Sequence, residues 1–146
     1  MTTPAEAKGA REAEALARAA HATQTDKSGE PYYEHLRRVA AKLEDDRART
    51  VALLHDVLED TPVTEDELRA QFPSEIVDAV AALTRRCDEP PDDYYLRVRA
   101  NPLALRVKIA DIHDNLDPSR LAELDEEKRR HFLNKYGHAL VALSGE

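Results

Sequence analysis

The chain has 146 residues, which is enough for one domain with its own hydrophobic core, and we expect residues 1–146 to form a single domain. Its only cysteine, Cys87, excludes an internal disulfide and any zinc site built from cysteines. The formal charge of −8 argues against a protein that wraps a nucleic-acid duplex, which needs a basic face. No signal peptide or membrane-spanning run is visible, so we expect a cytoplasmic protein with no membrane partner.

Helix-forming residues dominate the sequence, and only 4 glycines interrupt them. The pattern of caps, apolar spacing and prolines predicts an all-α bundle of seven or eight helices. In chain order the predicted helices cover about 3–23, 31–43, 46–60, 64–72, 74–86, 93–100, 101–116 and 125–144.

Several of the predicted boundaries rest on particular residues. Thr3 with Pro4 is expected to open the first helix, and Asn101 with Pro102 the seventh. A capping box of Thr64 and Glu67 predicts the fourth helix, and Ser74 is expected to cap the fifth. The adjacent prolines in CDEPPDD predict a loop, because they cannot lie inside a helix.

The run ALLHDVLED carries an unusual polar face. On a continuous helix, His55, Asp56, Glu59 and Asp60 share one side, with apolar residues opposite and only Ala52 between them. A solvated helix face usually mixes basic residues with its acids, and this one has no cation. The clustered carboxylates would repel one another, and a divalent ion would turn that repulsion into binding. An ordinary solvated face remains the alternative.

Two further residues are candidate ligands in the middle of other helices. His35 lies in YYEHLRRVA, and Asp111 lies in VKIADIHDN. Taken singly, His35 is more often a half-buried structural histidine, and Asp111 a surface carboxylate or a helix-helix partner. Helical periodicity does not show that these helices converge.

The ordered set of His35, His55-Asp56 and Asp111 resembles the H…HD…D signature of the HD superfamily of metal-dependent phosphohydrolases. Within this superfamily, the chain is similar to RelA/SpoT-type (p)ppGpp hydrolase domains and their small stand-alone relatives, including metazoan ones. The matching runs are HATQTDKSGEPYYEHLRRVA, ALLHDVLEDT, VDAVAALTR and LRVKIADIHDNL, over roughly residues 12–117. Because no synthetase segment follows residue 146, we expect a stand-alone hydrolase.

The resemblance implies a metal site and a reaction. One divalent ion, Mn²⁺ by analogy, would be bound by His35, His55, Asp56 and Asp111. Glu59 would act as general base, and Asp60 would orient the attacking water. The expected substrate is a small phosphorylated nucleotide, with 3′-pyrophosphohydrolysis of (p)ppGpp as first choice.

The expected substrate contacts are Lys27, Lys108, Asn115, Arg85 and Tyr95. Asp26 stands near a position where the family usually carries a basic residue, so Lys27 is expected to substitute for it. Asp114 and His113 also depart from the residues usual in alarmone hydrolases, which indicates a different pocket floor.

Three other functions are compatible with the sequence. The first is an HD hydrolase for a different nucleotide or for the phosphate of NADPH. The second is a non-catalytic nucleotide-binding HD module, which the intact Glu59–Asp60 pair disfavours. The third is a helical interaction protein that binds no metal.

Overall fold

The computed structural model describes residues 8–26 and 29–145. Over these ranges the chain is all-α, with ten helical segments and an isolated antiparallel bridge between Thr25 and Pro31. Two segments are single four-residue turns, so eight longer helices remain, as the sequence predicts. The segments are α1 (Ala10–Ala20), α2 (Tyr32–Ala41), α3 (Asp46–Leu54), α4 (Val57–Asp60), α5 (Glu65–Arg69), α6 (Ser74–Leu83), α7 (Pro91–Arg99), α8 (Pro102–Asn115), α9 (Pro118–Leu121) and α10 (Glu126–Ser144).

Side-chain caps begin several helices where the sequence predicts them. The carboxamide of Asn101 accepts from the amide of Ala104 at the start of α8, and Asp125 caps α10 in the same way. Thr64 accepts from the amide of Glu67, although its hydroxyl also donates to the Glu67 side chain. Helices α7 and α8 each begin with a proline. The backbone amide at the first position of a helix has no acceptor within the helix, so proline loses no hydrogen bond there.

Four predicted boundaries are wrong or untested. Thr3 and Pro4 lie outside the described residues, and α1 ends at Ala20 instead of Thr23. Ser74 is the first residue of α6 and makes no capping bond, because the extended Pro73 occupies the cap position. Helix α6 stops at Leu83, short of the predicted Arg86, and Thr84 is extended.

The predicted third helix is broken at the HD dipeptide into α3 and α4. In an unbroken helix the carbonyl of Ala52 would accept from the amide of Asp56. Instead it accepts from Nδ1 of His55 at 2.6 Å, and Asp56 has φ −105° and ψ 1°. The side-chain bond therefore competes with the helical ladder and redirects the chain at the two residues of interest.

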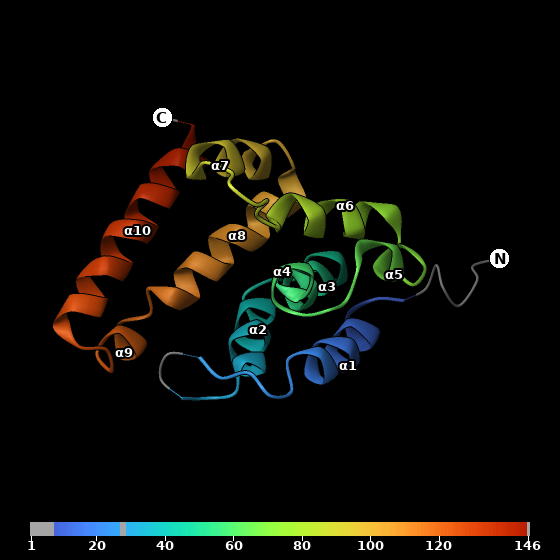
Figure 1. The fold of residues 1–146 in the computed structure, drawn as a ribbon, viewed down its shortest axis with the longest axis horizontal. Coiled ribbons are helices and arrows are strands. Elements are labelled where there is room, and N and C mark those ends of the chain that lie inside the picture. The colour runs from blue at the N-terminus through green and yellow to red at the C-terminus, as the bar shows by residue number, and fades with distance from the viewer. Residues whose placement is uncertain (1–7, 27–28, 146) are drawn as a thin grey trace.

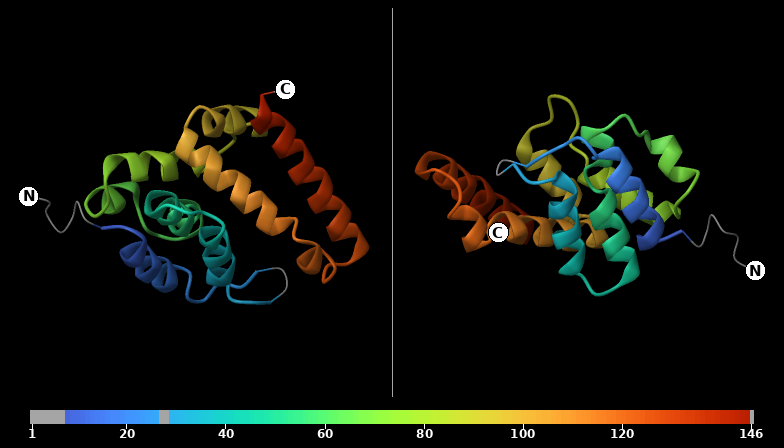
Figure 2. Two further views of the ribbon diagram at one scale, coloured as in Figure 1. Left: turned by 180° about the vertical axis from the view of Figure 1, so that it is seen from behind. Right: turned by 90° about the horizontal axis from the view of Figure 1, so that it is seen from below.

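Helix α3 lies at the centre of the molecule. Most of its residues are buried, and it packs against α1, α2, α6 and α8. Helix α7 packs on α8 and α10, which places α10 along the outer side of α8 (Figures 1 and 2). His35 therefore comes from α2, His55 from the end of α3 and Asp111 from α8, and these three helices contact one another.

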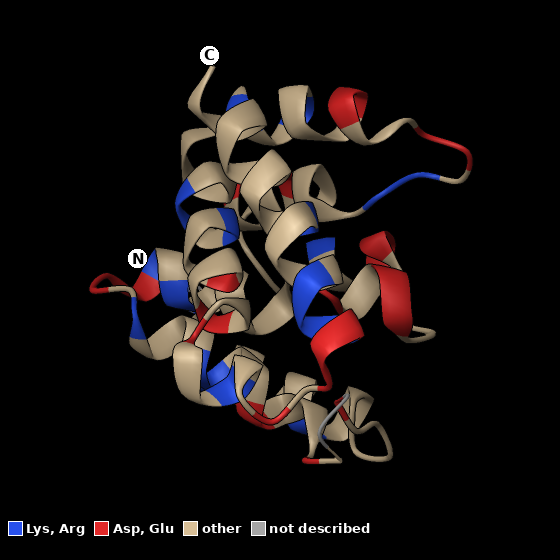
Figure 3. Ribbon diagram, turned by 90° about the vertical axis from the view of Figure 1, so that its left-hand side faces the viewer, with Lys and Arg blue, Asp and Glu red and all other residues tan. Residues whose placement is uncertain are grey.

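Charges of both signs are interspersed over the face shown in Figure 3, and that face is not uniformly basic. Among the described residues, no helix is both long and apolar enough to cross a membrane.

Candidate metal centre and active site

A cavity of about 470 Å³ opens where α2, α4, α8 and α10 meet. Its volume falls in the range that proteins use for small molecules of nucleotide size. All the predicted site residues except Lys27 line it: His35, His55, Asp56, Glu59, Asp60, Arg85, Tyr95, Lys108, Asp111 and Asn115. Lys27 lies outside the described residues.

Three side chains at the cavity floor can share one metal ion. His35, His55 and Asp111 each offer a ligand atom, and these atoms all lie within 4.8 Å of one another. All three residues are buried, which sequence periodicity did not show. Two imidazoles and a carboxylate form a mixed nitrogen and oxygen donor set, which suits manganese, iron, nickel or zinc.

His55 is oriented toward the centre by the backbone. Because Nδ1 donates to the carbonyl of Ala52, Nε2 points into the cluster, where this buried atom has no hydrogen-bond partner. Burial opposes protonation of His55, but the neighbouring carboxylates of Asp56 and Asp111 outweigh it and raise the pKa to about 9. A bound cation would replace the proton that these carboxylates favour, so the ring fits a metal ligand.

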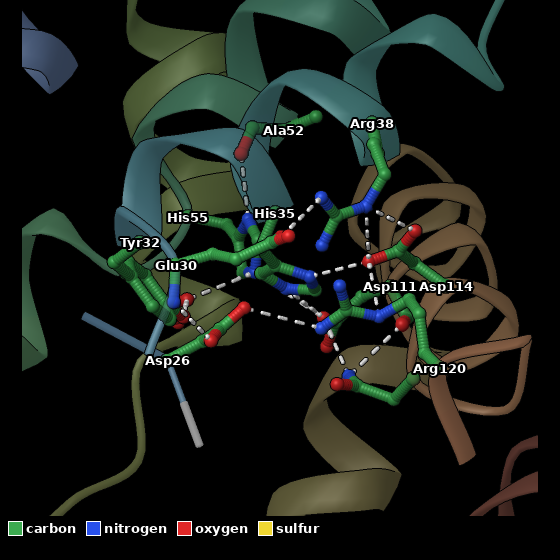
Figure 4. Close-up of polar contacts among 12 residues, drawn as sticks. Asp26, Glu30, Tyr32, His35, Arg38, Ala52, His55, Asp111, Asp114 and Arg120 are labelled. Atoms are coloured by element: carbon green, nitrogen blue, oxygen red, sulfur yellow. Dashed lines mark hydrogen bonds and ion pairs between the residues drawn. The ribbon is translucent and has the colours of Figure 1, made fainter. Parts of the chain in front are cut away.

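His35 lies between two carboxylates (Figure 4). Its Nε2 is 2.8 Å from Oδ1 of Asp111, and its Nδ1 is 2.7 Å from Oδ2 of Asp114. Burial works to lower the pKa of His35, but these two hydrogen bonds outweigh it and hold the pKa above its usual value. The arrangement matches a metal-ligating histidine whose second nitrogen is held by a carboxylate.

Asp111 is held by two residues of its own helix. Nζ of Lys108 lies 3.2 Å from Oδ2, and Nδ2 of Asn115 donates to Oδ1 at 3.2 Å and to the carbonyl at 3.0 Å. Burial alone would raise the pKa of Asp111, but Lys108 and the two histidines hold it well below its usual value. The carboxylate is therefore an anion in the pocket, with Lys108 as its counterion.

Asp56 lies beside this three-residue cluster. Its Oδ2 is 3.2 Å from Nε2 of His55 and accepts a hydrogen bond from the hydroxyl of Tyr32. Burial, and then the nearby Asp56 charge, raise the pKa of Tyr32 well above its usual value, so the phenol stays a donor. Asp56 is thus a neighbour of the cluster and is not one of the three residues whose ligand atoms all lie within 4.8 Å of one another.

The acidic pair lies at the edge of the cavity on α4. Oε1 of Glu59 accepts from the amide of Arg85 at 2.8 Å, which fixes the carboxylate and ends α6. Burial raises the pKa of Asp60, and the charges of Asp56 and Glu59 add to the effect. His21 and Gln24 support this turn from behind, since Gln24 donates to the carbonyl of Asp60 at 2.9 Å.

The predicted substrate contacts differ in how they are bonded. Lys108 and Asn115 are bonded to Asp111, and the Lys108 ammonium also lies over the ring of Tyr94. The guanidinium of Arg85 lies over the same ring, 5.6 Å from its centre. Tyr95 lines the cavity and packs against Tyr94.

Several lining residues were not predicted from the sequence. Tyr32 is part of the GEPY run but was given no role. Asp114, which does not line the cavity but is bonded to His35, was noted only as a departure from the family. Arg120 and the α10 residues Phe132, Lys135 and Tyr136 also line the cavity. The spacing of three to four residues on α10 indicates that these side chains share one face of the helix, but the same spacing is equally typical of a face that packs against the core.

The fold and the site define a class: all-α proteins with a buried centre of histidines and carboxylates at the HD dipeptide. Residues 13–89 match the HD domain family, and the chain belongs to that family.

Curated relatives share this region. A guanosine-3′,5′-bis(diphosphate) 3′-pyrophosphohydrolase of Haemophilus influenzae is 36% identical over 128 residues, which are 79% of this chain and 19% of the relative. The Vibrio cholerae protein of the same name is 35% identical over 133 residues, again 19% of the relative. The bifunctional (p)ppGpp synthase/hydrolase SpoT of Escherichia coli is 33% identical over 133 residues. The chain thus spans about a fifth of the length of the curated relatives it matches.

A solved structure supports the fold over nearly the whole chain. A metazoan ortholog of SpoT, described as hydrolysing ppGpp and acting in starvation responses, superposes with a TM-score of 0.75 at 24% identity. The superposition covers 99% of this chain and 89% of the other.

Proposed function

We propose that the chain is a metal-dependent phosphohydrolase that removes pyrophosphate from the 3′ position of (p)ppGpp. The observation that carries the proposal is the convergence of His35, His55 and Asp111, with the acidic pair of α4 on the same nucleotide-sized cavity. The names of the curated relatives support the substrate and reaction. We further propose that the enzyme acts in the cytoplasm on this small nucleotide, with no nucleic-acid or membrane partner.

His35, His55, Asp56 and Asp111 would hold one divalent ion, which we propose is Mn²⁺. When bound, such an ion acts as a Lewis acid on phosphoryl oxygens and makes water a stronger nucleophile. The hydrogen bonds of His35 to Asp114 and of His55 to Ala52 fix which ring nitrogen faces the ion.

Glu59 and Asp60 would handle the proton of the attacking water. Glu59 is anchored by the amide of Arg85, so its carboxylate stays at the cavity edge and can accept that proton. Asp60 would orient the water beside it. Tyr32 holds Asp56 in place, and Lys108 balances the charge of Asp111, so neither carboxylate is free to turn away from the site.

The test is a panel of ppGpp, pppGpp, NADPH and simple nucleoside phosphates, assayed with Mn²⁺. We expect the alarmones to be turned over fastest, with stoichiometric release of pyrophosphate. Equal or faster turnover of NADPH or of a nucleoside phosphate would refute the alarmone assignment and leave the metal site untouched.

Two variants separate metal binding from chemistry. H55A should lose both the metal and activity, whereas E59Q should keep the metal, as measured by elemental analysis, and lose about 10²- to 10⁴-fold in kcat. If both variants hydrolyse every nucleotide as fast as the wild type, the measured hydrolysis does not come from this site, and the catalytic proposal is wrong. A purified wild type without any bound transition metal, even after incubation with Mn²⁺, would contradict the metal site itself.

A further inference from the structure

Arg120, the third residue of the short helix α9, lines the cavity between two carboxylates (Figure 4). Its Nη2 lies 3.5 Å from Oδ2 of Asp26, which belongs to the loop before α2, and its Nε lies 3.8 Å from Oδ2 of Asp114. These contacts join two segments that are 94 residues apart in the sequence. The guanidinium is mostly buried, so its charge acts in a medium of low polarity.

Neither contact fully satisfies the guanidinium. Both distances exceed the 2.7–3.2 Å usual for an N–H···O bond, and the buried Nε has no hydrogen-bond partner. Asp114 is already bonded to His35 at 2.7 Å and to Nε of Arg38 at 3.0 Å. Arg120 therefore keeps donor capacity that a better acceptor in the cavity could use.

The anion that best fits these donors is a phosphate group. A guanidinium fork pairs with two phosphate oxygens at once, and a phosphate carries more negative charge than the single carboxylate of Asp26. The carboxylates of Asp56, Glu59 and Asp60 repel anions, and the ammonium of Lys108 is paired with Asp111. A phosphate in the cavity therefore depends on the other cations of its lining, which are Arg85, Lys135 and Arg120. Arg120 contacts Asp114, which is bonded to Nδ1 of His35, whereas Nε2 of His35 is bonded to Asp111. Arg120 and the predicted metal ligands therefore lie on opposite sides of the His35 ring.

We propose that Arg120 binds a second phosphate group of the nucleotide, separate from the one at the metal cluster, and that Asp26 occupies Arg120 when the cavity is empty. Binding of the nucleotide then exchanges the Asp26 contact for the phosphate contact. Asp26 thus competes with the ligand for Arg120, and only a group more negatively charged than one carboxylate displaces it. The inference rests on the proposed nucleotide substrate and extends it to the selection of nucleotides with two separate phosphate groups.

Calorimetric titration of the Mn²⁺-loaded full chain with GDP tests the proposal without relying on hydrolysis. GDP lacks the 3′ group that the metal cluster would take, so its 5′ diphosphate is the group that would contact Arg120. R120Q should raise the dissociation constant of GDP about tenfold, as loss of a charge-assisted hydrogen bond predicts. D26N should lower it about threefold or more, because the amide keeps the shape and the acceptor for the amide of Glu30 but not the charge. The matched control E30Q removes an acid from the same loop that faces Arg38 at 3.9 Å, and it should leave the constant unchanged.

Unphosphorylated guanosine separates charge from shape. Its affinity should be the same in the wild type, R120Q and D26N. The proposal is overturned if R120Q binds GDP as tightly as the wild type, if D26N does not tighten GDP binding, or if guanosine weakens in parallel with GDP. Should R120Q fail to fold by circular dichroism, D26N decides alone.

The outcome is independent of the hydrolysis panel. If no alarmone is hydrolysed but GDP binding responds to the two substitutions as expected, the proposed reaction fails and the Arg120 inference stands. If the alarmones are hydrolysed and GDP binding does not respond, only the Arg120 inference fails.

Discussion

Asp114 is the residue on which the orientation of His35 depends. Its side chain is 1% exposed and is bonded to Nδ1 of His35 and to Arg38. Carboxylates in this position fix the ring of a ligating histidine and raise its basicity, and their loss usually weakens metal binding.

We therefore expect D114N to weaken Mn²⁺ binding about 10- to 100-fold, measured by competition with a chelating dye. The amide can still accept from His35, so the loss reflects charge more than shape. D92N, which removes an exposed carboxylate that pairs with His138, is the control and should bind the metal as the wild type does. Unchanged affinity in D114N would show that His35 needs no carboxylate behind it.

At the scale of elements, α3 is the part of the core that sets the position of His55. Leu54, directly before it, is fully buried, so L54A should leave a cavity and lower the free energy of unfolding by about 2–5 kcal/mol. Urea denaturation measures the loss. The control L96A removes the same atoms from a residue that is 52% exposed on α7 and should cost much less. Similar losses in the two variants would contradict a central role for α3.

The loop before α7 is held by an ion pair between Glu89 and Arg97, whose guanidinium also donates to the carbonyl of Thr84 at 2.9 Å. The hydrogen bond from Arg97 lowers the pKa of Glu89 from 4.5 to about 2. A carboxylate whose pKa is lower in the folded state than in the unfolded state stabilises the fold at pH values above its unfolded-state pKa. That stabilisation is lost as the pH falls through the folded-state pKa.

The E89Q variant should therefore be less stable than the wild type at pH 7. The difference should start to shrink below about pH 4.5 and be mostly lost near pH 2, where Glu89 becomes protonated in the folded protein as well. Denaturation curves at a series of pH values measure it. E14Q, which removes an exposed pair with Arg18, should differ little from the wild type at any pH. A difference for E89Q that stays constant down to pH 2 would rule out the ion pair as its cause.

Local sequence signals predicted most helices, because caps such as Asn101 and Thr64 act within one turn. The break at His55–Asp56 was missed, since it depends on an imidazole turning back to the carbonyl of Ala52. The helical periodicity nevertheless placed His55, Asp56, Glu59 and Asp60 on one side, and all four line the cavity.

The convergence of His35 and Asp111 on His55 is a tertiary property that helical periodicity does not contain. Only the family resemblance predicted it. Arg120 and the α10 residues were missed for the same reason, because their place in the cavity depends on how the chain returns after α8.

At the scale of the whole molecule, the proposed metal site would tie together α2, α8 and the end of α3, which contact one another. A ligand that binds only the folded state adds RT ln(1 + [L]/Kd) to the free energy of unfolding, about 2.7 kcal/mol at a hundredfold excess over Kd. At roughly 2–4 °C per kcal/mol for a chain of this size, Mn²⁺ should raise Tm by roughly 5–11 °C over protein stripped with chelator.

Differential scanning calorimetry over a range of Mn²⁺ concentrations measures this shift. H55A should lose the metal-dependent shift, whereas E59Q should keep it, because Glu59 lies outside the ligand set. The stripped H55A variant should be less stable than the stripped wild type, because the substitution removes a buried ring and its hydrogen bond to the carbonyl of Ala52, so each variant is compared with its own metal-free form. A wild-type Tm that does not change with Mn²⁺ concentration would show that the three helices are held together by packing alone.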